Sequence, residues 1–341
     1  MSTSPQNGTI VITGCSSGFG RVTALHLAKL GWHVFATVRK EADQTSLLSE
    51  ATTRGCKDKL TTLLCDITRA EQVAALGQAV STVIPRLDAL LNNAGTGYAA
   101  PLELLPLDDL RAQLEINVIA HLAVTQALLP LLKPARGVII NVSSVHGRLP
   151  VPIIGAYSAS KFALEALSDV LRIELAPFGV RVVVIEPSAS DTNIWETSIQ
   201  RARARLEQHL DGPYGRLLTT CEAIVRRSAA GGFPPQLFAD TVLKILTSRH
   251  PRARYVVPGS ARREMIRINC YPTGFGIGCS DVYSSGDGMI RQLKDGKLSE
   301  TRNMKRSLAW SIQFNQDDTL PCAQEQLAVL VRNGQRWTKN G

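Results

Sequence analysis

The chain has 341 residues, of which 44% are hydrophobic and 20% are charged, and its formal net charge is +9. This composition excludes a chain that is disordered or of low complexity as a whole, and the length allows a substantial buried core. Nearly all of the positive excess lies in residues 188–341, but no interleaved aromatic residues or recognition motif accompany it, so we expect a solvated surface and no nucleic-acid partner.

Residues 8–190 alternate between short apolar strands and helices. The first strand, residues 8–13, ends at a glycine-rich turn, and residues 21–30 then have helical spacing. Five further strands are expected at residues 32–38, 60–65, 89–91, 137–141 and 180–185. Helices are expected between them, at about residues 41–53, 69–83, 107–131 and 156–176. Because continuously apolar strands alternate with helices, the sequence predicts a parallel sheet that is covered on both faces.

The chain changes character after the sixth strand. Residues 188–235 have helical parts and no strand, and a helix at residues 236–247 and a seventh strand at residues 254–257 follow. After about residue 268 the chain is rich in turn residues, and residues 323–332 favour one late helix. We therefore expect an α/β fold, a doubly wound parallel sheet of about seven strands. It forms a single domain at residues 8–260, with a C-terminal extension of unknown structure at residues 268–341.

Targeting signals and cysteine usage point to an intracellular setting. No uninterrupted apolar run approaches the ~20 residues of a transmembrane helix, so we expect no transmembrane segment. The first eight residues are polar and lack the features of a signal peptide. The seven cysteines form no CxxC pair, which argues against a disulfide framework and against a zinc site, and we expect no metal. We expect a reducing compartment and a cytoplasmic location.

The loop TGCSSGFG after the first strand has the pattern of a dinucleotide-binding turn. Gly14 permits a tight turn, Gly18 lets the backbone approach a ligand, and Gly20 lets the following helix pack near the sheet. The helix N-terminus then presents free N–H groups to a pyrophosphate. A glycine loop alone is weak evidence, because structural turns have the same composition.

Ser144, Tyr157 and Lys161 form a second chemical pattern. Tyr157 and Lys161 lie four residues apart on an expected helix and share one face. A free tyrosine has a pKa near ~10, and a neighbouring ammonium group lowers it toward a useful range. Ser144, at the end of the fifth strand, is placed to donate to a substrate oxygen beside the phenol. A YxxxK pattern alone is common by chance, but here it follows the glycine loop and the sequence NNAG at residues 92–95.

The sequence resembles the short-chain dehydrogenase/reductase family, in its main branch, over about residues 8–260. The shared motifs occur in the family's order: TGCSSGFG at 13–20, Cys65-Asp66-Ile67, NNAG at 92–95, Ile116-Asn117, NVSS at 141–144, YSASK at 157–161 and Pro187-Ser188. The resemblance implies a Rossmann-type fold and a nicotinamide-dependent oxidoreductase that acts on CH–OH groups or carbonyls.

The resemblance assigns catalytic roles to Asn117, Ser144, Tyr157 and Lys161. Tyr157 would be the general acid in carbonyl reduction, or the base in alcohol oxidation. Lys161 would lower the pKa of Tyr157 and bind the nicotinamide ribose. Ser144 would polarise the substrate carbonyl, and Asn117 would hold a water that relays protons through Lys161. Hydride would pass between the nicotinamide and the substrate carbon.

The resemblance also implies a cofactor cleft, with Asp66 at the adenine amino group and Ile67 at the adenine ring. The expected cofactor-binding residues are Gly14, Ser16, Ser17, Gly18, Phe19, Gly20, Arg39, Asp66, Ile67, Asn93, Ala94, Gly95, Tyr157, Lys161, Pro187, Ser188 and Thr192. The family usually has Pro-Gly where this chain has Pro187-Ser188. Serine tolerates fewer backbone conformations than glycine, so we expect the nicotinamide end to differ slightly.

Cofactor preference depends on the end of the second strand. An acidic residue there would bind the ribose 2′-hydroxyl and favour NAD(H). The family alignment places Val38 at that position, and Arg39 follows it with a charge suited to a 2′-phosphate. We therefore expect NADP(H) to be preferred, with NAD(H) possible. The alternative interpretation of Arg39 is a solvated residue after a strand.

The substrate pocket is expected between the segments after NNAG and after Ser144 and a lid region at residues 188–235. Candidate wall residues are mostly apolar, although about half would be ordinary core: Tyr98, His146, Leu149, Val151, Ile153, Ile154, Ile194 and Trp195. We expect substrate contacts from Ser144, His146, Leu149, Ile154 and Trp195; a surface or helix-cap role is the alternative for His146. An apolar wall suits a lipophilic ketone or alcohol. The GFG variant and the VSSVHGRLPVP stretch resemble family members that act on steroids, retinoids and related carbonyls.

Two further expectations concern assembly and competing functions. The helices expected at residues 107–131 and 156–176 correspond to helices that pair between subunits in the family, so we expect a homo-oligomer, a dimer or tetramer, although their apolar residues also suit a core. A catalytically silent NADP-binding regulator is one alternative, against which the intact catalytic residues argue. An epimerase or dehydratase of the longer branch is another, but its G-x-x-G-x-x-G spacing does not occur at residues 14–20.

Overall fold

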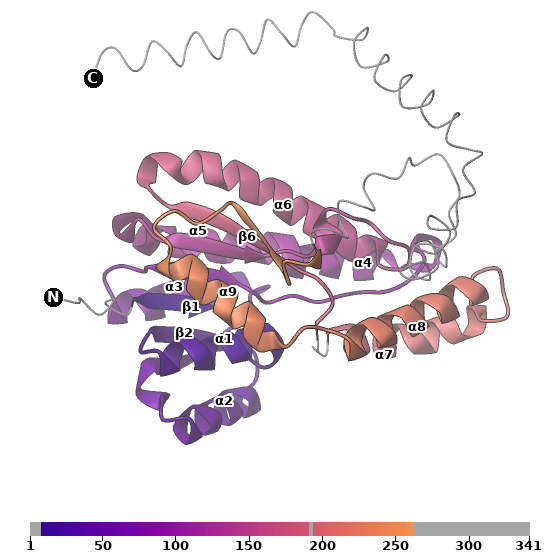
Figure 1. Cartoon of the computed structure of the whole chain (residues 1–341), viewed down its shortest axis with the longest axis horizontal. Helices are drawn as coiled ribbons and strands as arrows, with labels where there is room; N and C mark the ends of the chain where they lie inside the picture. Colours follow the sequence, from indigo (N-terminus) through magenta and orange to yellow (C-terminus); the bar gives the residue numbers. More distant parts are fainter. Residues whose placement is uncertain (1–7, 191–193, 262–341) are drawn as a thin grey trace, which may run out of the picture. The chain divides into compact units, whose positions relative to one another are not determined.

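Seven parallel strands form one sheet in the order β3-β2-β1-β4-β5-β6-β7, in a computed structural model that describes residues 8–190 and 194–261 (Figure 1). The strands are β1 Thr9–Ile12, β2 His33–Val38, β3 Leu60–Leu64, β4 Ala89–Asn92, β5 Val138–Val142, β6 Arg181–Pro187 and β7 Arg254–Val257. The chain progresses outward in one direction from β1 to β3 and in the other from β4 to β7. Loops at the carboxyl ends of β1 and β4 therefore meet at a topological switch point, where ligands bind in such sheets.

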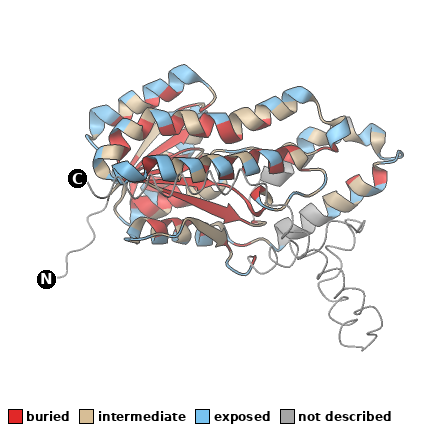
Figure 2. Cartoon of the chain, turned by 90° about the horizontal axis from the view of Figure 1, so that it is seen from above, coloured by how far each residue is buried: buried red, intermediate tan, exposed pale blue. Residues whose placement is uncertain are grey.

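Helices cover both faces of this sheet (Figures 1 and 2). One face carries α1 Gly18–Lys29, α2 Glu41–Thr53 and α9 Pro235–Thr247, and the other carries α3 Ala70–Val83, α5 Ala120–Ala135 and α6 Gly155–Leu175. Alternate strand residues enter the two cores: Ile10 and Ile12 pack on the first face and Val11 on the second. The expected doubly wound α/β fold is confirmed.

The expected helix at residues 107–131 consists of three consecutive helical pieces. They are α4 Leu107–Leu114, a π-helical turn at Glu115–Ile119, and α5. A π-turn inserts one extra residue per turn, and such turns occur frequently at functional sites. Apolar periodicity does not reveal a single inserted residue, so the sequence predicted an uninterrupted helix.

The same continuous segment, Leu107–Ala135, changes one expectation about membranes. It is 29 residues long with a mean hydropathy of 1.4 over its most apolar window, so among the described residues it is long and apolar enough to cross a membrane by length and composition. Polar residues such as His121 and Thr125 interrupt its apolar runs, so the length of uninterrupted runs did not predict a segment of this kind. A core helix passes the same test, and Val124, Leu128 and Leu132 of α5 pack in the core of the sheet.

The segment expected to form a lid contains α7 Ile194–Leu206 and α8 Gly215–Ala230. Ser190 and Phe233, at its two ends, form an isolated parallel β-bridge. The expected site residue Thr192 and the C-terminal extension at residues 268–341, with its expected helix at 323–332, lie outside the described residues. Trp195 and Ile194 lie in α7, but their side chains are outside the described part of the chain.

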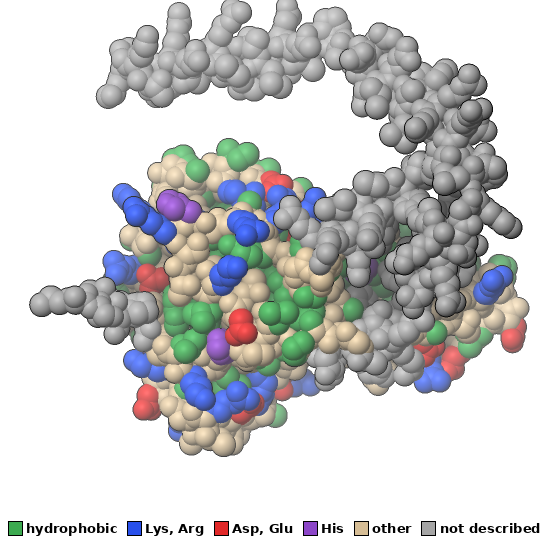
Figure 3. All heavy atoms as spheres, viewed as in Figure 1, with side chains coloured by type: hydrophobic (Ala, Val, Ile, Leu, Met, Phe, Trp, Pro, Cys, Tyr) green, Lys and Arg blue, Asp and Glu red, His purple; other side chains and the backbone are tan. Residues whose placement is uncertain are grey.

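The basic residues on the face shown in Figure 3 are dispersed among polar and apolar side chains. Among the described residues on this face, Lys and Arg side chains do not gather in one patch. Several arginines are instead engaged with carboxylates, as in the pair of Arg21 with Glu50 at 2.7 Å. On this face the arrangement is that of a solvated charged surface.

Candidate functional site

The glycine loop between β1 and α1 is shaped by its glycines. Gly14 has φ +71° and Gly18 has φ +54°, both in the left-handed region that favours glycine. A Cβ on Gly14 would lie 2.8 Å from Ala94 Cα, and a Cβ on Gly20 would lie 2.3 Å from the Gly14 carbonyl oxygen. The Ser17 side chain accepts no capping hydrogen bond from α1, so the first backbone N–H groups of the helix are not paired with it. The loop thus forms a backbone cradle of the kind that the sequence predicts for a pyrophosphate.

Hydrogen bonds join the loops after β1 and β4 at the switch point. The Asn93 amide donates to the carbonyl oxygens of Thr13, at 2.8 Å, and Gly14, at 3.1 Å. The Thr13 hydroxyl accepts from the backbone N–H groups of Asn93 and Ala94, at 2.9 and 3.0 Å. Asn93 therefore shapes the cleft with its side chain, and Thr13 is a shaping residue that sequence reasoning missed.

The expected cofactor residue Phe19 uses its ring for packing. The ring stacks on Phe238 of α9 with centroids 4.2 Å apart, and Phe233 stacks at 5.7 Å. This side chain therefore holds α1 against α9. A contact between the Phe19 backbone and the cofactor stays a prediction.

The residues expected at the adenosine end lie at the ends of β2 and β3. Arg39 is exposed and Ile67 is buried. Burial opposes ionisation of Asp66, but hydrogen bonds from Thr68 and the charges of Arg39 and Arg69 outweigh it and lower the pKa of that carboxyl. Asp66 is therefore an ionised acceptor within the field of Arg39.

Ser144, Tyr157 and Lys161 come together as predicted. Ser144 follows β5 and caps the short helical turn Val145–Gly147, while Tyr157 and Lys161 lie in the first turns of α6. The Ser144 side chain is hydrogen-bonded to Tyr157, and Lys161 Nζ lies 5.7 Å from the Tyr157 ring centroid. All three residues are buried.

Burial dominates the ionisation of this group. It raises the pKa of Tyr157 to about 12, against the hydrogen bond from Ser144, and lowers the pKa of Lys161 to about 8, against the charge of Glu165. Burial thus outweighs any lowering of the Tyr157 pKa here, and the expected contribution of Lys161 to that lowering stays a prediction. The Lys161 ammonium donates to Val142 O at 2.8 Å, and the buried phenol keeps its proton.

Asn117 lies in the π-helical turn and is fully buried. Its amide oxygen accepts from Thr96 N at 3.0 Å, and its amide nitrogen donates to Thr96 O at 3.0 Å and to Ser160 Oγ at 3.1 Å. A Cβ on Gly95 would lie 3.4 Å from Asn117 Oδ1 and 3.9 Å from Lys161 Nζ. Asn117 therefore ties the NNAG loop to α6 beside Lys161.

His121, one turn after Asn117, was not predicted. It is buried, and its Nε2 lies 2.6 Å from Ala94 O. Burial, reinforced by the charge of Lys161, lowers the pKa of His121 to about 3, although the bond to Ala94 opposes this. The imidazole is thus neutral and donates from Nε2 to the loop. A histidine among apolar helix residues carries no sequence motif, so the pattern gave no signal for this contact.

The expected substrate residues lie on segments around Tyr157. His146 packs edge-on to the Tyr157 ring at 6.4 Å, and its Nδ1 lies 3.2 Å from Leu149 O. Burial lowers the pKa of His146 and keeps its ring neutral. Ile154 is buried at the start of α6, and the preceding Ile153 has φ +70°, a strained conformation for a β-branched residue.

Helix α7 contacts the loop that follows NNAG. Ser198 Oγ donates to Gly97 O at 2.6 Å, and the Arg201 guanidinium lies 4.5 Å from the centre of the Tyr98 ring. A cleft between them is lined by Tyr98, Leu104, Asp109, Ser198, Arg201 and Leu206. The lid region thus borders a cleft beside the loop that Asn117 holds.

Comparisons with known proteins agree with this geometry. A family profile described as short chain dehydrogenase matches residues 8–203. The chain is 38% identical to mouse retinol dehydrogenase 5, covering 72% of this chain and 79% of the relative. It is 33% identical to an NADPH-dependent 3-dehydrocapnine reductase of Ornithobacterium rhinotracheale, covering 72% and 87%. It also resembles the crystal structure of a metagenomic short-chain oxidoreductase in complex with NADP, with a TM-score of 0.57, 25% identity, and 73% and 96% of the two chains covered.

Proposed function

The chain belongs to the short-chain dehydrogenase family, and from this premise we propose that it is an NADP(H)-dependent oxidoreductase acting on a lipophilic ketone or secondary alcohol. The observation that carries the proposal is the buried cluster of Ser144, Tyr157 and Lys161, with Asn117 beside it, at the carboxyl end of β5, which is next to β4 in the sheet. Turnover distinguishes this proposal from a silent NADP-binding regulator. The epimerase and dehydratase alternatives have no support from the glycine spacing at residues 14–20.

The residues of the cleft fit a dinucleotide. The Gly14 and Gly20 positions have no room for a Cβ, because atoms of Ala94, Asn93 and the loop itself lie there. The loop is therefore closely packed where α1 begins, and the N-terminus of this helix is the place where a pyrophosphate would bind. When bound, NADP(H) supplies or accepts the hydride. Asn93 and Asn117 hold the loops of the cleft in place.

The proton chemistry falls to Tyr157, with Ser144 beside it. Ser144 orients the substrate oxygen, and Tyr157 gives that oxygen a proton as the carbonyl is reduced. A phenol with a pKa of about 12 holds its proton at neutral pH, which is the form that a general acid requires.

The preference for NADP(H) is argued from the end of β2. Val38 occupies the position where an acidic residue would bind a ribose 2′-hydroxyl, and the exposed Arg39 follows it. A guanidinium is suited to a 2′-phosphate. The relative named as an NADPH-dependent reductase supports the same preference.

Replacement of Arg39 tests this preference. We expect Arg39→Asp to raise the KM for NADPH about tenfold or more, with a smaller change for NADH, because an anion then faces the phosphate. Steady-state kinetics at 340 nm measure both constants. Lys40→Asp, which makes the same change of charge at the next residue, is the matched control. An unchanged KM for NADPH in Arg39→Asp would remove the assignment.

The lipophilic substrate class is argued from the walls of the site. Ile154 is buried beside Tyr157, and the ring of Tyr98 lines the cleft next to α7. Relatives named for retinol and for a 17-beta-hydroxysteroid support the class. Purified protein assayed against steroids, retinoids and small aldehydes, with NADPH and with NADH, tests it. Activity confined to small hydrophilic aldehydes would contradict it.

A homo-oligomer is proposed from the outer face of α6. Phe162, Val170 and Ile173 form an exposed apolar stripe on this helix, and Ile119 is exposed on the adjoining π-turn. A stripe of this kind suits a second copy of the same surface.

A cytoplasmic location is proposed from the cysteines. Cys15, Cys56 and Cys65 are free and buried thiols, which suits a reducing compartment. Fractionation of cells that express the full chain tests the location, and recovery in the membrane fraction would contradict it.

A further inference from the structure

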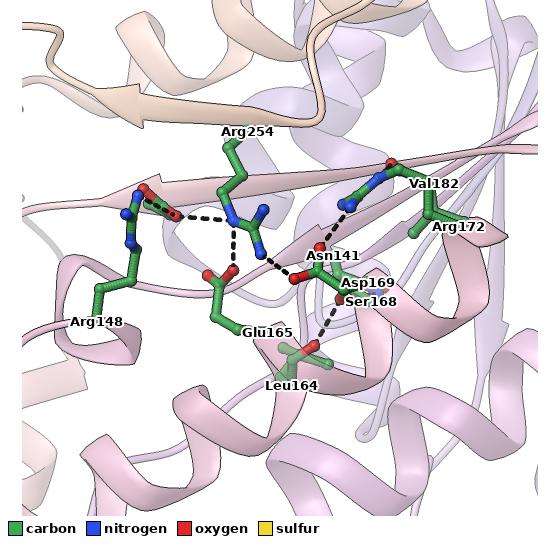
Figure 4. A network of polar contacts seen from close by, with 10 residues as sticks. Asn141, Arg148, Leu164, Glu165, Ser168, Asp169, Arg172, Val182 and Arg254 are labelled. Atoms are coloured by element: carbon green, nitrogen blue, oxygen red, sulfur yellow. Dashed lines mark hydrogen bonds and ion pairs between the residues drawn. The ribbon is translucent and has the colours of Figure 1, made fainter. Parts of the chain in front are cut away.

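Six charged side chains form a network on and around α6, the helix that carries Tyr157 and Lys161 (Figure 4). Its members are Arg148, Glu165, Asp169, Arg172, Glu186 and Arg254. Arg254 of β7 reaches two residues of α6: its Nε lies 2.9 Å from Glu165 Oε2, and its Nη2 lies 2.6 Å from Asp169 Oδ2. The three arginines and three carboxylates join α6 to β6, to β7 and to the segment after Ser144.

Glu165 is the member of this network that lies next to Lys161. It lies four residues after Lys161 on α6, so the two side chains share one face of the helix. A Cβ on Gly147 would lie 3.2 Å from both Lys161 O and Glu165 Cγ, so the turn after Ser144 packs where these two residues adjoin. Asp169 lies one further turn away and is more exposed.

Lys161 is a buried cation whose hydrogen-bond acceptor is neutral. Its ammonium donates to the Val142 carbonyl, and the carboxylate that acts on it is Glu165. On its other sides it faces the neutral His121 and the protonated Tyr157. A buried cation requires an opposite charge nearby, because burial alone drives it toward its neutral form.

The Glu165 carboxylate is in turn held by a cation. Arg254 binds its Oε2, while Oε1 has no hydrogen-bond partner among the described residues. Glu186 faces Glu165 from β6, where burial and the charge of Glu165 raise its pKa, and Arg148 and Arg254 lie 3.6 and 3.5 Å from its Oε1. Arg254 therefore fixes Glu165 among like charges that would otherwise push it away.

We propose that Glu165 is a positioning residue whose carboxylate keeps Lys161 in its ammonium form, and that Arg254 holds this carboxylate in place. The proposal rests on the proposed function, in which Lys161 belongs to the buried catalytic cluster with Ser144 and Tyr157. Loss of the Glu165 charge makes the neutral form of Lys161 easier to reach. The pH above which Lys161 loses its proton then falls.

A pair of charge-neutralising variants tests the proposal. In Glu165→Gln, the basic limb of kcat/KM for ketone reduction moves by about one pH unit to lower pH, because a buried cation loses its opposite charge. Asp169→Asn removes the same charge from the same arginine, but two turns from Lys161, and the limb stays in place. Glu165→Asp keeps the charge and restores the limb.

Three results would overturn the proposal. One is an unmoved limb in Glu165→Gln, and another is an equal movement in both neutralised variants. The third is a uniform loss of activity at every pH, which indicates a merely structural role. If Glu165→Gln does not fold, Glu165→Met has a similar volume and carries the same prediction.

A direct titration separates this proposal from the proposed function. The 13Cε resonance of Lys161, assigned by its absence in Lys161→Arg, is followed by NMR in the full chain with and without NADP+. We expect the titration midpoint of Lys161 at pH about 8 in the natural chain and at a lower pH in Glu165→Gln. If no ketone is turned over, the proposed function fails while this midpoint still decides the role of Glu165. An equal midpoint in the two proteins would refute it.

Discussion

Burial moves the pKa values of Tyr157 and Lys161 in opposite directions, and both side chains are pushed toward their neutral forms. The pKa of the Tyr157 phenol is raised to about 12, and the pKa of the Lys161 ammonium is lowered to about 8. Sequence reasoning considered the attraction between the two groups and missed the larger cost of desolvation, which depends on tertiary packing. The motifs thus located residues that the fold brings together, while their ionisation depends on burial, and their catalytic roles stay a prediction.

His121 provides a prediction at the same scale. Its pKa in the folded chain is lowered to about 3, so the unfolded chain binds one more proton than the folded chain as pH falls below about 6.5. Its contribution to stability is complete above that pH and is lost as pH falls toward 3. We expect the melting temperature of His121→Gln to depend less on pH between 6.5 and 4 than that of the natural chain.

Calorimetry of both proteins over this pH range measures the difference. His250 is exposed and provides the matched control, because its replacement by glutamine leaves no buried imidazole changed. Parallel pH profiles for the natural chain and His121→Gln would contradict the assignment of a buried neutral imidazole.

At the scale of elements, the local patterns predicted all seven strands and the order of the helices. Apolar strands and glycine turns are encoded within short stretches, which is why Tyr157 and Lys161 were recognised on one helix face. Contacts between distant elements were not predicted. Arg254 lies 89 residues beyond Glu165, and neither a motif nor a period links β7 to α6. The π-turn that carries Asn117 was missed because it inserts a single residue.

The glycine loop gives the prediction for an element. A Cβ on Gly20 would lie 2.3 Å from the Gly14 carbonyl oxygen, a backbone atom that has to shift. We expect Gly20→Ala to lower the free energy of unfolding by about 1–3 kcal/mol, as overpacking does, and to weaken NADPH binding. Chemical denaturation and NADPH fluorescence measure the two effects.

Gly259→Ala is the control, because among the described residues no atom beyond its chain neighbours lies within 4 Å of its added Cβ. Equal stability of the two variants would show that the loop is not tightly packed at Gly20.

At the scale of the whole molecule, the family match at residues 8–203 includes the glycine loop and the four residues proposed to be catalytic. The structure adds β7 and α9, which complete the sheet and its first core. The order of the motifs, and not length and composition, led to the expected end of the domain near residue 260, and that boundary stays a prediction. The role of residues 268–341 stays a prediction, because these residues lie outside the described part of the chain.

The proposed assembly is tested on the same scale. Ile173 is 76% exposed on the apolar stripe of α6. We expect the natural chain to form a dimer or tetramer, and Ile173→Asp to shift it toward the monomer, because a charge is then buried against an apolar partner. Light scattering after size exclusion measures the mass. Leu30→Asp, at the exposed residue that directly follows α1, should leave the mass unchanged. A natural chain that is monomeric would contradict the proposed interface.

The central claim is that Tyr157 donates the proton when a ketone is reduced. The most direct measurement is the rate of NADPH oxidation at 340 nm with a lipophilic ketone, for the natural chain and for Tyr157→Phe, with NADPH binding followed by fluorescence. We expect Tyr157→Phe to bind NADPH as the natural chain does and to turn over at least about 100-fold more slowly, which is the scale of general acid catalysis. Equal rates for the two proteins would contradict the account.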